Sequence, residues 1–266
     1  MAYSLSWLPD VLLAAGLKVA EVPGWRDRGC GDAGETFGIL CHHTAGPVSG
    51  NMPSLQVVID GRPDLRGPLA QLALGRDGTY YVIAAGKANH AGRGIWAGVT
   101  DGNAHFIGIE AENTGLPNDR WPVIQMDAYQ RGVAAILKNA RLDSERCAGH
   151  KEYALPQGRK SDPSFDMHVF RTEVARLLNG SAPAPIPIPV AEQAKPNASA
   201  RPTIRRGTSN ELVAVVQNAL FLQATGLFDA QTEAKVREFQ RKSGLVPDGI
   251  VGPASWAALD RLARAA

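Results

Sequence analysis

The amino-acid sequence predicts an α/β domain with a mixed sheet, followed by a small all-α domain of three helices. Strand-like apolar runs alternate with helical patterns over residues 1–180. Prolines at positions 183, 185, 187 and 189 then alternate with small or aliphatic residues, a composition that favours an extended spacer over a packed core. Helix-forming segments follow this spacer. We therefore expect domains at 1–180 and 206–266, joined by a linker at 181–205.

The strands of the first domain are expected in short apolar segments that are bounded by turn residues. These segments are 36–42, 71–74, 79–83 and 105–111. The sequence Arg-Asp-Gly at 76–78 is a turn signal between the second and the third of them. Strands and helices in one domain indicate a mixed α/β fold.

Helices are expected before and after these strands in the chain. Residues 7–12 predict a short N-terminal helix that covers the first domain. Apolar residues recur at helical spacing over 129–137 and again over 170–178. Asp166 is the expected N-cap of the later helix.

The second domain contains three expected helices. Residues 211–220 predict the first, Asp229 caps a second that runs to Lys242, and Pro253 begins the third. Three short helices in so few residues form a small bundle.

Composition excludes several classes of protein. Apolar residues make up 44% of the chain and charged residues 20%, as in soluble globular proteins. The net charge of +2 is too small to indicate a nucleic-acid partner. No run approaches the ~18 consecutive apolar residues of a membrane span, and the N-terminus lacks the basic leading region of a signal peptide. We expect a monomer that is made in the cytoplasm and does not insert into a membrane.

Cys30, Cys41 and Cys147 are an odd number of cysteines, which argues against a full disulfide framework. Cys41 and Cys147 lie in apolar segments and are expected to be buried thiols. The position of Cys41 beside His42 leaves a metal contact open.

Histidines and one aspartate form the strongest candidate for a metal site. His42 and His43 end an apolar run, and His150 and Asp162 lie on a later return of the chain. Two histidines and one carboxylate are a ligand set for a catalytic zinc ion, which keeps a fourth position open. Zinc lowers the pKa of a water molecule and polarises a carbonyl, so the set predicts amide hydrolysis. Strand alternation leaves open which histidine of the pair faces the metal.

A carboxylate and a lysine complete the candidate chemistry. Ile107 and Ile109 share one face of their expected strand, which leaves Glu110 and Glu112 on the other face as candidate general bases. Lys160 precedes Asp162 by two positions, so an extended segment directs both side chains to the same side. A fixed cation there stabilises a developing oxyanion.

Three blocks carry a resemblance to a known family. CHHTAG at 41–46, HFIGIEAENTG at 105–115 and GHKEYALPQGRKSDP at 149–163 resemble the signature blocks of the zinc-dependent N-acetylmuramoyl-L-alanine amidases, a group that includes the peptidoglycan recognition proteins. The resemblance spans 36–170 and implies an α/β amidase domain.

Site residues also follow from this resemblance. It implies a Zn²⁺ ion bound by His42, His150 and Asp162. It further implies that Glu110, directly after the Gly-Ile pair, moves the proton, and that Lys160 stabilises the oxyanion.

Two further segments bear on the site. ANHAGRGIW at 88–96 contains a His-Ala-Gly motif that recurs in the family, so Asn89 and His90 are expected in the substrate groove. Some family members carry a catalytic tyrosine just before the Asp-Gly turn. The sequence PLAQLALGRDG at 68–78 has none, and Tyr80 and Tyr81 follow the turn.

The end of the chain resembles a second family. GLFDAQTEAKVREFQRKSGLVPDGIVGPASWAAL at 226–259 is similar to the three-helix peptidoglycan-binding module of wall hydrolases. Together the resemblances imply an enzyme that cleaves the amide between N-acetylmuramic acid and L-alanine of the stem peptide. The arrangement looks like a bacteriophage endolysin that acts on the host wall after release. A bacterial autolysin, a non-catalytic recognition protein and a zinc peptidase of the stem peptide are the alternatives.

Overall fold

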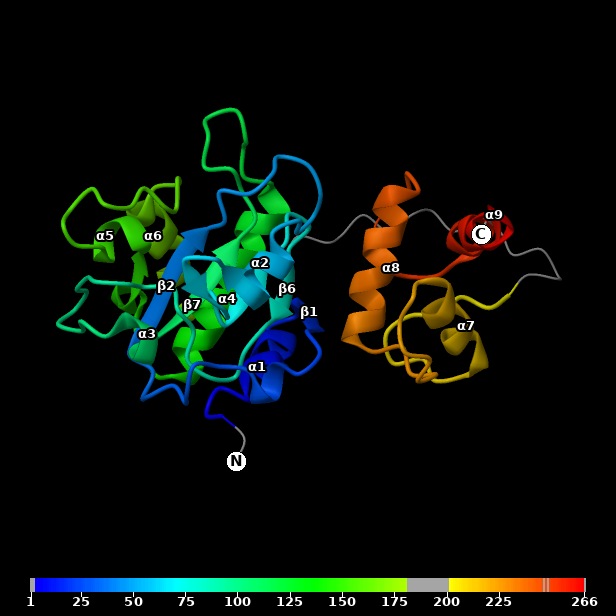
Figure 1. Cartoon of the computed structure of the whole chain (residues 1–266), viewed down its shortest axis with the longest axis horizontal. Coiled ribbons are helices and arrows are strands. Elements are labelled where there is room, and N and C mark those ends of the chain that lie inside the picture. The colour runs from blue at the N-terminus through cyan, green and yellow to red at the C-terminus, as the bar shows by residue number, and fades with distance from the viewer. Residues whose placement is uncertain (1–2, 181–200, 246, 248, 266) are drawn as a thin grey trace. The chain divides into compact units, whose positions relative to one another are not determined.

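The computed structural model describes residues 3–180, 201–245, 247 and 249–265, which fall into two units, Met1–Ile186 and Pro187–Ala266 (Figure 1). Each unit has its own core of buried apolar residues. Most of the predicted linker, residues 181–200, lies outside the described residues. The domain boundaries at 1–180, 181–205 and 206–266 therefore stay a prediction.

A six-stranded mixed sheet forms the frame of the first unit. Its strands lie in the order β1 (Lys18–Glu21), β6 (Thr79–Val82), β5 (Leu72–Leu74), β7 (Phe106–Ala111), β2 (Gly38–His43) and β8 (Cys147–Gly149). β5 and β6 pair antiparallel across the predicted turn, and all other neighbours pair parallel. The prediction of an α/β fold with a mixed sheet is confirmed.

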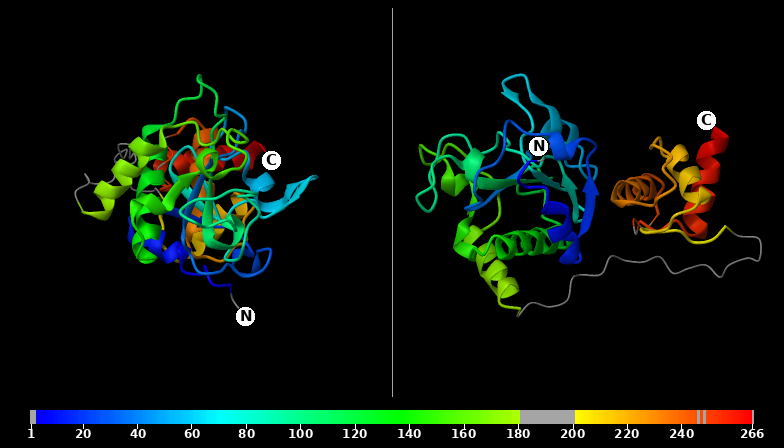
Figure 2. Two further views of the ribbon diagram at one scale, coloured as in Figure 1. Left: turned by 90° about the vertical axis from the view of Figure 1, so that its left-hand side faces the viewer. Right: turned by 90° about the horizontal axis from the view of Figure 1, so that it is seen from below.

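Three helices, α1 (Leu8–Ala14), α4 (Val123–Asn139) and α6 (Met167–Leu178), cover one face of this sheet (Figure 2). They pack on alternate strand residues such as Ile39 and Ile109. Because successive strand residues point to opposite faces, His42 and Glu110 lie on the other face. The sheet thus separates the helical core from the residues of the candidate site.

Two buried thiols belong to the helical side of the sheet. Cys41 and Cys147 are fully buried, and their sulfur atoms lie 3.5 Å apart. The prediction of buried thiols is therefore confirmed. Cys41 points away from the face of His42, which excludes the metal contact that the sequence left open.

Several short elements were not predicted from the sequence pattern. β1 has four residues and β8 has three, and both are edge strands of the sheet. The other short elements are α2 (Leu55–Asp60), β3 (Gly61–Arg62), β4 (Leu65–Arg66), α3 (Gly102–His105), α5 (His150–Tyr153), and the 3₁₀ turns Trp25–Asp27 and Ser144–Arg146. Elements of this length carry little periodic signal. β5 and β6 are equally short, but the turn signal at 76–78 lies between them.

The predicted helix caps are present. The Asp166 carboxylate accepts hydrogen bonds from two backbone N–H groups in the first turn of α6. The Asp229 carboxylate accepts one from Thr232 at the start of α8.

The second unit consists of α7 (Glu211–Ala219), α8 (Ala230–Lys242) and α9 (Pro253–Ala265). Their core includes Val213, Phe228 and Trp256. The three-helix prediction is confirmed.

The same pattern of hydrogen bonds from a buried glutamine side chain to a loop occurs twice in this unit. The buried side-chain amide of Gln217 is bonded to the Leu227 carbonyl, the Thr232 hydroxyl and the Gly226 N–H. The buried amide of Gln240 is bonded in the same way to the Ile250 carbonyl, the Ser255 hydroxyl and the Gly249 N–H. The connections that follow α7 and α8 are therefore structurally equivalent.

Among the described residues, no helix has the length and apolar character that crossing a membrane requires.

Candidate metal centre and active site

Three polar side chains converge on the face of the sheet opposite the helical core. His42 comes from β2, His150 begins α5 directly after β8, and Asp162 lies on the loop that returns toward them. Oδ2 of Asp162 lies 3.0 Å from Nδ1 of His42 and 3.1 Å from Nδ1 of His150. Because β2 and β8 are neighbouring parallel strands, their C-terminal ends present the two histidines side by side.

The surroundings of His150 fix which of its ring nitrogens carries hydrogen. Nε2 lies 2.9 Å from the backbone carbonyl oxygen of Ala91. A carbonyl oxygen can only accept, so Nε2 is the donor. In the neutral ring the lone pair is then on Nδ1, which faces Asp162.

The ring of His42 is fixed through a second histidine. Nε2 of His90 lies 3.1 Å from the Phe106 carbonyl, so this nitrogen is the donor. Nδ1 of His90 is then the acceptor for Nε2–H of His42, at 3.1 Å. The lone pair of His42 is therefore on Nδ1, which also faces Asp162. Burial lowers the pKa of His42 to about 4, so the ring is neutral at pH 7.

The resulting cluster fits a metal ion. Nδ1 of His42, Nδ1 of His150 and one oxygen of Asp162 lie within 4.8 Å of one another. Three acceptor atoms this close repel one another unless a cation or a proton lies between them. Two imidazole nitrogens and one carboxylate oxygen are a zinc-type donor set that leaves a coordination position open. His42, not His43, belongs to the cluster, since Nδ1 of His43 accepts from the N–H of Ser164.

One dipeptide orients both histidines of the cluster. The ring of His90 accepts from His42, and the carbonyl of Ala91 accepts from His150. The side-chain oxygen of Asn103 accepts from the backbone N–H of both His90 and Ala91, at 2.9 and 2.8 Å. Gly108 makes room for this arrangement, because a Cβ there would lie 2.7 Å from Cγ of His90.

The placement of Asn89 and His90 in a substrate groove stays a prediction, and the structure gives the contacts that each side chain makes within the protein. His90 is buried, and its two ring nitrogens are bonded to His42 and to the Phe106 carbonyl, so the ring is placed to orient His42. The Asn89 amide donates to the Arg66 carbonyl at 2.9 Å and to the sulfur of Cys30 at 3.2 Å.

Glu110 lies beside the cluster. It pairs in register with His42 across β7 and β2, and its Oε1 is 4.0 Å from Nδ1 of His42. Its Oε2 is buried and has no hydrogen-bond partner among the described residues. Burial, together with the charge of Asp162, raises the pKa of Glu110 to about 8, although Lys160 opposes the shift. A carboxyl group with a free, buried oxygen and a pKa near neutrality can both accept and donate a proton.

Glu112 shares the face of Glu110 but has a different environment. Its carboxylate accepts hydrogen bonds from the backbone N–H and hydroxyl of Ser54 and from the hydroxyl of Thr44. The side chain is fully buried. Strand alternation alone cannot separate the two glutamates, and their hydrogen bonds do. Glu112 holds the loops beside the site, and its replacement would disturb them.

Lys160 adds a positive charge near the cluster. It is half-buried, and its charge lowers the pKa of both His42 and Glu110. Its ammonium group forms no ion pair with any residue that the structure describes. The charge is therefore available to an anion that forms beside the cluster.

No tyrosine takes the place next to Glu110. The neighbour of Glu110 on β5 is Ala73, and the neighbour of Ala73 on β6 is Tyr81. At about 4.8 Å per strand, Tyr81 lies roughly 10 Å from Glu110 along this row. The Tyr81 hydroxyl accepts from the side-chain amide of Asn51 at 3.0 Å.

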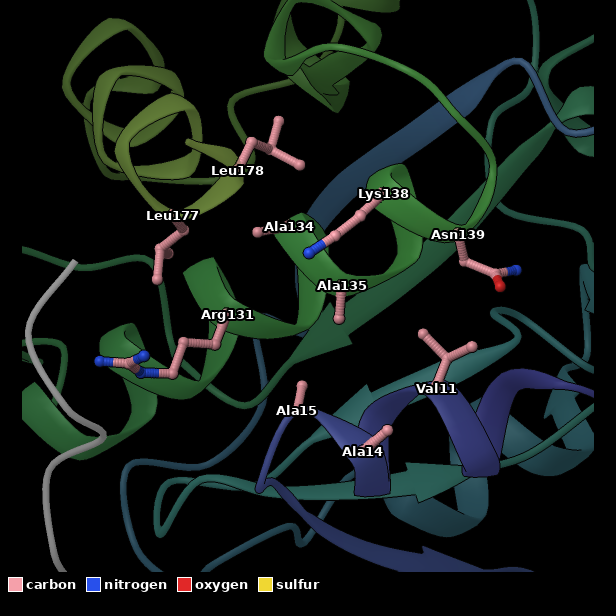
Figure 3. Close-up of a pocket in the computed structure, with 10 residues that line it drawn as sticks. All are labelled: Val11, Ala14, Ala15, Arg131, Ala134, Ala135, Lys138, Asn139, Leu177 and Leu178. Carbon is pink, nitrogen blue, oxygen red and sulfur yellow. The ribbon is translucent and has the colours of Figure 1, made fainter. Parts of the chain in front are cut away.

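A separate pocket of about 400 Å³ lies on the helical side, between α1, α4 and α6 (Figure 3). Alanines and leucines line it, together with Arg131 and Lys138. It contains none of the residues of the metal cluster.

Two family models match the chain. A model described as N-acetylmuramoyl-L-alanine amidase matches residues 33–165, and a model described as a peptidoglycan binding domain matches residues 211–259. An uncharacterised protein encoded in the bpoA1 3′ region of Kitasatospora aureofaciens is 57% identical over 35 residues, which are 13% of this chain and 30% of that relative.

Solved structures show similar chains at low identity. The amidase AmiD of E. coli, in complex with anhydro-N-acetylmuramic acid-L-Ala-D-γ-Glu-L-Lys, is 17% identical with a TM-score of 0.44, over 90% of this chain and 92% of that one. The amidase LysC of Clostridium intestinale is 18% identical with a TM-score of 0.44, over 59% and 97%. A mutant endolysin from Bacillus subtilis is 17% identical with a TM-score of 0.45, over 59% and 99%.

Replacement of His90 tests its positioning role. His90→Leu removes the acceptor of the His42 ring, so the protein should fold but bind Zn²⁺ roughly 10- to 100-fold more weakly. Competition with a chromophoric chelator measures this affinity. The matched control is His168→Leu, at an exposed histidine. Equal zinc affinity of the His90 variant and the unchanged protein would show that the ring does not orient His42.

The raised pKa of Glu110 predicts a pH effect on the stability of metal-free protein. The folded chain keeps this proton up to about pH 8, whereas the unfolded chain loses it near pH 4.5. Folded protein therefore binds more protons in this window, and the contribution of Glu110 to stability is lost as the pH rises. Glu110→Gln cannot ionise, so its stability relative to the unchanged protein should rise from pH 5 to pH 9, by at most about 1.4 kcal/mol per pH unit.

Denaturant unfolding in the presence of a chelator, at pH 5 and pH 9, measures this difference. Glu145→Gln is the control, since 75% of that side chain is exposed. A difference between Glu110→Gln and the unchanged protein that stays constant with pH would contradict the raised pKa.

Proposed function

We propose that this chain, which belongs to the N-acetylmuramoyl-L-alanine amidase family, hydrolyses the amide between N-acetylmuramic acid and L-alanine in peptidoglycan. The observation that carries the proposal is the convergence of His42, His150 and Asp162 beside Glu110. The amidase family model covers all four residues. A donor set with an open position next to a carboxyl group of raised pKa is suited to amide hydrolysis.

Zn²⁺ held by His42, His150 and Asp162 would polarise the scissile carbonyl and lower the pKa of a water molecule. Glu110 would accept the proton that the attacking water loses, and then donate it to the nitrogen of the departing L-alanine. Its free Oε2 supports this role, since no protein donor competes for that oxygen among the described residues. A cation in the cluster would lower the pKa of Glu110 from about 8 and favour the accepting form.

Lys160 would stabilise the negative charge that develops on the carbonyl oxygen. In the resting site a lysine beside a metal ion is repelled, so its interaction becomes favourable only as the oxyanion forms. Such a difference between the transition state and the resting state is what accelerates a reaction.

The second unit would hold the enzyme on its insoluble substrate. The match of residues 211–259 to a peptidoglycan-binding family supports this role. With a catalytic unit, a proline-rich segment and a wall-binding unit, the chain has the organisation of an endolysin. We therefore propose lysis of a bacterial wall as its biological role, with turnover of a bacterium's own wall as the alternative.

Mass spectrometry of digested sacculi tests the reaction. The expected products are glycan strands with a free lactyl carboxyl group and peptides with a free N-terminal L-alanine. Glu110→Gln should retain zinc but lose roughly 10²- to 10⁴-fold in turnover, the usual range for acid–base catalysis. The control is Glu145→Gln. Cleavage within the stem peptide, or full activity in metal-free protein, would refute the proposal.

Removal of the second unit tests the proposed domains. A protein that ends near residue 180 retains the sheet, its helices and the metal cluster, so it should fold and bind zinc. Its turnover on a small soluble muropeptide should equal that of the full chain. Its activity on intact walls should fall, because a tether raises the local concentration of enzyme without changing the chemistry. Loss of activity on the soluble muropeptide would instead show that the second unit contributes to the active site.

A further inference from the structure

Phe221 has an unusual backbone and an unusual environment. Its φ is 57°, in the left-handed region, where a bulky side chain is disfavoured. The residue is 91% exposed, so the ring contributes almost nothing to the core of its unit. A strained backbone that carries an exposed aromatic ring has no explanation in the packing of this unit, and such a position is a candidate for function.

The connections that follow α7 and α8 are structurally equivalent, so their comparison shows what the fold requires at the position of Phe221. Phe221 follows α7, where Leu222 donates to the Gln217 carbonyl at 2.8 Å and Phe221 donates to the Asn218 carbonyl at 3.1 Å. These bonds form the turn that usually ends a helix with glycine.

The same turn follows α8. There Leu245 donates to the Gln240 carbonyl at 2.8 Å, and Gly244 donates to the Arg241 carbonyl at 3.1 Å. The residue with positive φ is Gly244, at 69°. The fold therefore accepts glycine at this turn, and Phe221 is a departure from it within the same chain.

Arg141 is a useful comparison, since it occupies the same kind of turn after α4 with a φ of 58°. Its charge lies at the C-terminal end of a helix, where a cation is favourable. Phe221 has no such local compensation.

The chain segment that contains Phe221 is neutral. Residues 212–228 contain no charged side chain. The exposed polar neighbours in sequence include Asn218 and Gln223, which offer side-chain amides. The equivalent segment after α8 is different, because Arg241 and Lys242 precede Gly244.

We infer that Phe221 is a contact residue for the glycan strand of peptidoglycan, where its ring stacks on the apolar face of a sugar. This inference rests on the proposed wall-binding role of the second unit. A flat aromatic ring covers a pyranose face well, and the neutral side-chain amides of Asn218 and Gln223 match sugar hydroxyl and N-acetyl groups. Stem peptides carry charged groups and would require charged partners, which this segment lacks.

Phe221→Gly separates binding from folding. The substitution places at this turn the residue that its repeat already uses, so the melting temperature should not fall. Affinity for purified sacculi should decrease about 10-fold, the scale of an aromatic anchor. Turnover on a soluble muropeptide should stay unchanged. Phe221→Tyr should retain binding, because it keeps the ring.

The binding assay uses the full chain with Glu110→Gln as a common background, so that the walls are not digested. Arg141→Gly is the matched control, since it also places glycine at a left-handed turn that ends a helix, and its affinity should not change. Peptide-free glycan strands should displace the chain with Phe221 from sacculi. They should have a much smaller effect on the binding of the glycine variant.

Each other result has a distinct meaning. If the chain with Phe221 does not sediment with sacculi, the wall-binding role itself is wrong. If that chain binds and Phe221→Gly binds equally, the ring is not a contact residue. Competition by free stem peptide in place of glycan overturns the sugar assignment. A lower melting temperature or lower soluble turnover for the glycine variant shows that the ring packs on this protein.

Discussion

The candidate metal site depends on the orientation of two imidazole rings, those of His42 and His150. Each ring could present either nitrogen, and only one choice directs a lone pair at Asp162. The carbonyls of Ala91 and Phe106 make that choice, the first directly and the second through His90. Because carbonyl oxygens cannot donate, the orientation does not depend on the metal being present. The donor set is therefore organised before a metal binds, which reduces the cost of ordering it on binding.

The parallel pairing of β7, β2 and β8 explains why these groups meet. Glu110 and His42 are partners in register, and His150 follows β8 at the same edge of the sheet. Ligands in α/β proteins commonly bind at the C-terminal ends of parallel strands, and the cluster has this location. The opposite face is occupied by the helical core, so a strand slipped by one residue would exchange Ile109 and Glu110 and destroy both core and site.

The sequence predicted the long elements and the identity of the cluster, for different reasons. Helices α4 and α6 have regular apolar spacing, and their periodicity sufficed. His42, His150 and Asp162 were identified from motifs, because strand alternation could not choose between His42 and His43. The contacts of His90 with His42 and Phe106 were not predicted, since these residues are distant in sequence and only the folded chain brings them together. β1 and β8 are defined by their neighbours in the sheet, and their three or four residues have no pattern of their own.

Two positions depart from what folding alone favours, and both are informative. Oε2 of Glu110 is buried without a partner among the described residues, and Phe221 holds an exposed ring on a left-handed backbone. In each case another residue shows the ordinary solution: Glu112, directly after the strand of Glu110, is fully hydrogen-bonded, and Gly244 ends the equivalent turn. In natural sequences, local preferences usually agree with the global fold. A residue that breaks this agreement, while a comparable residue in the same chain keeps it, therefore points to selection for chemistry or binding. From the same comparison we expect that Glu110 and Phe221 can be replaced without loss of the fold, whereas replacement of Glu112 should disturb it.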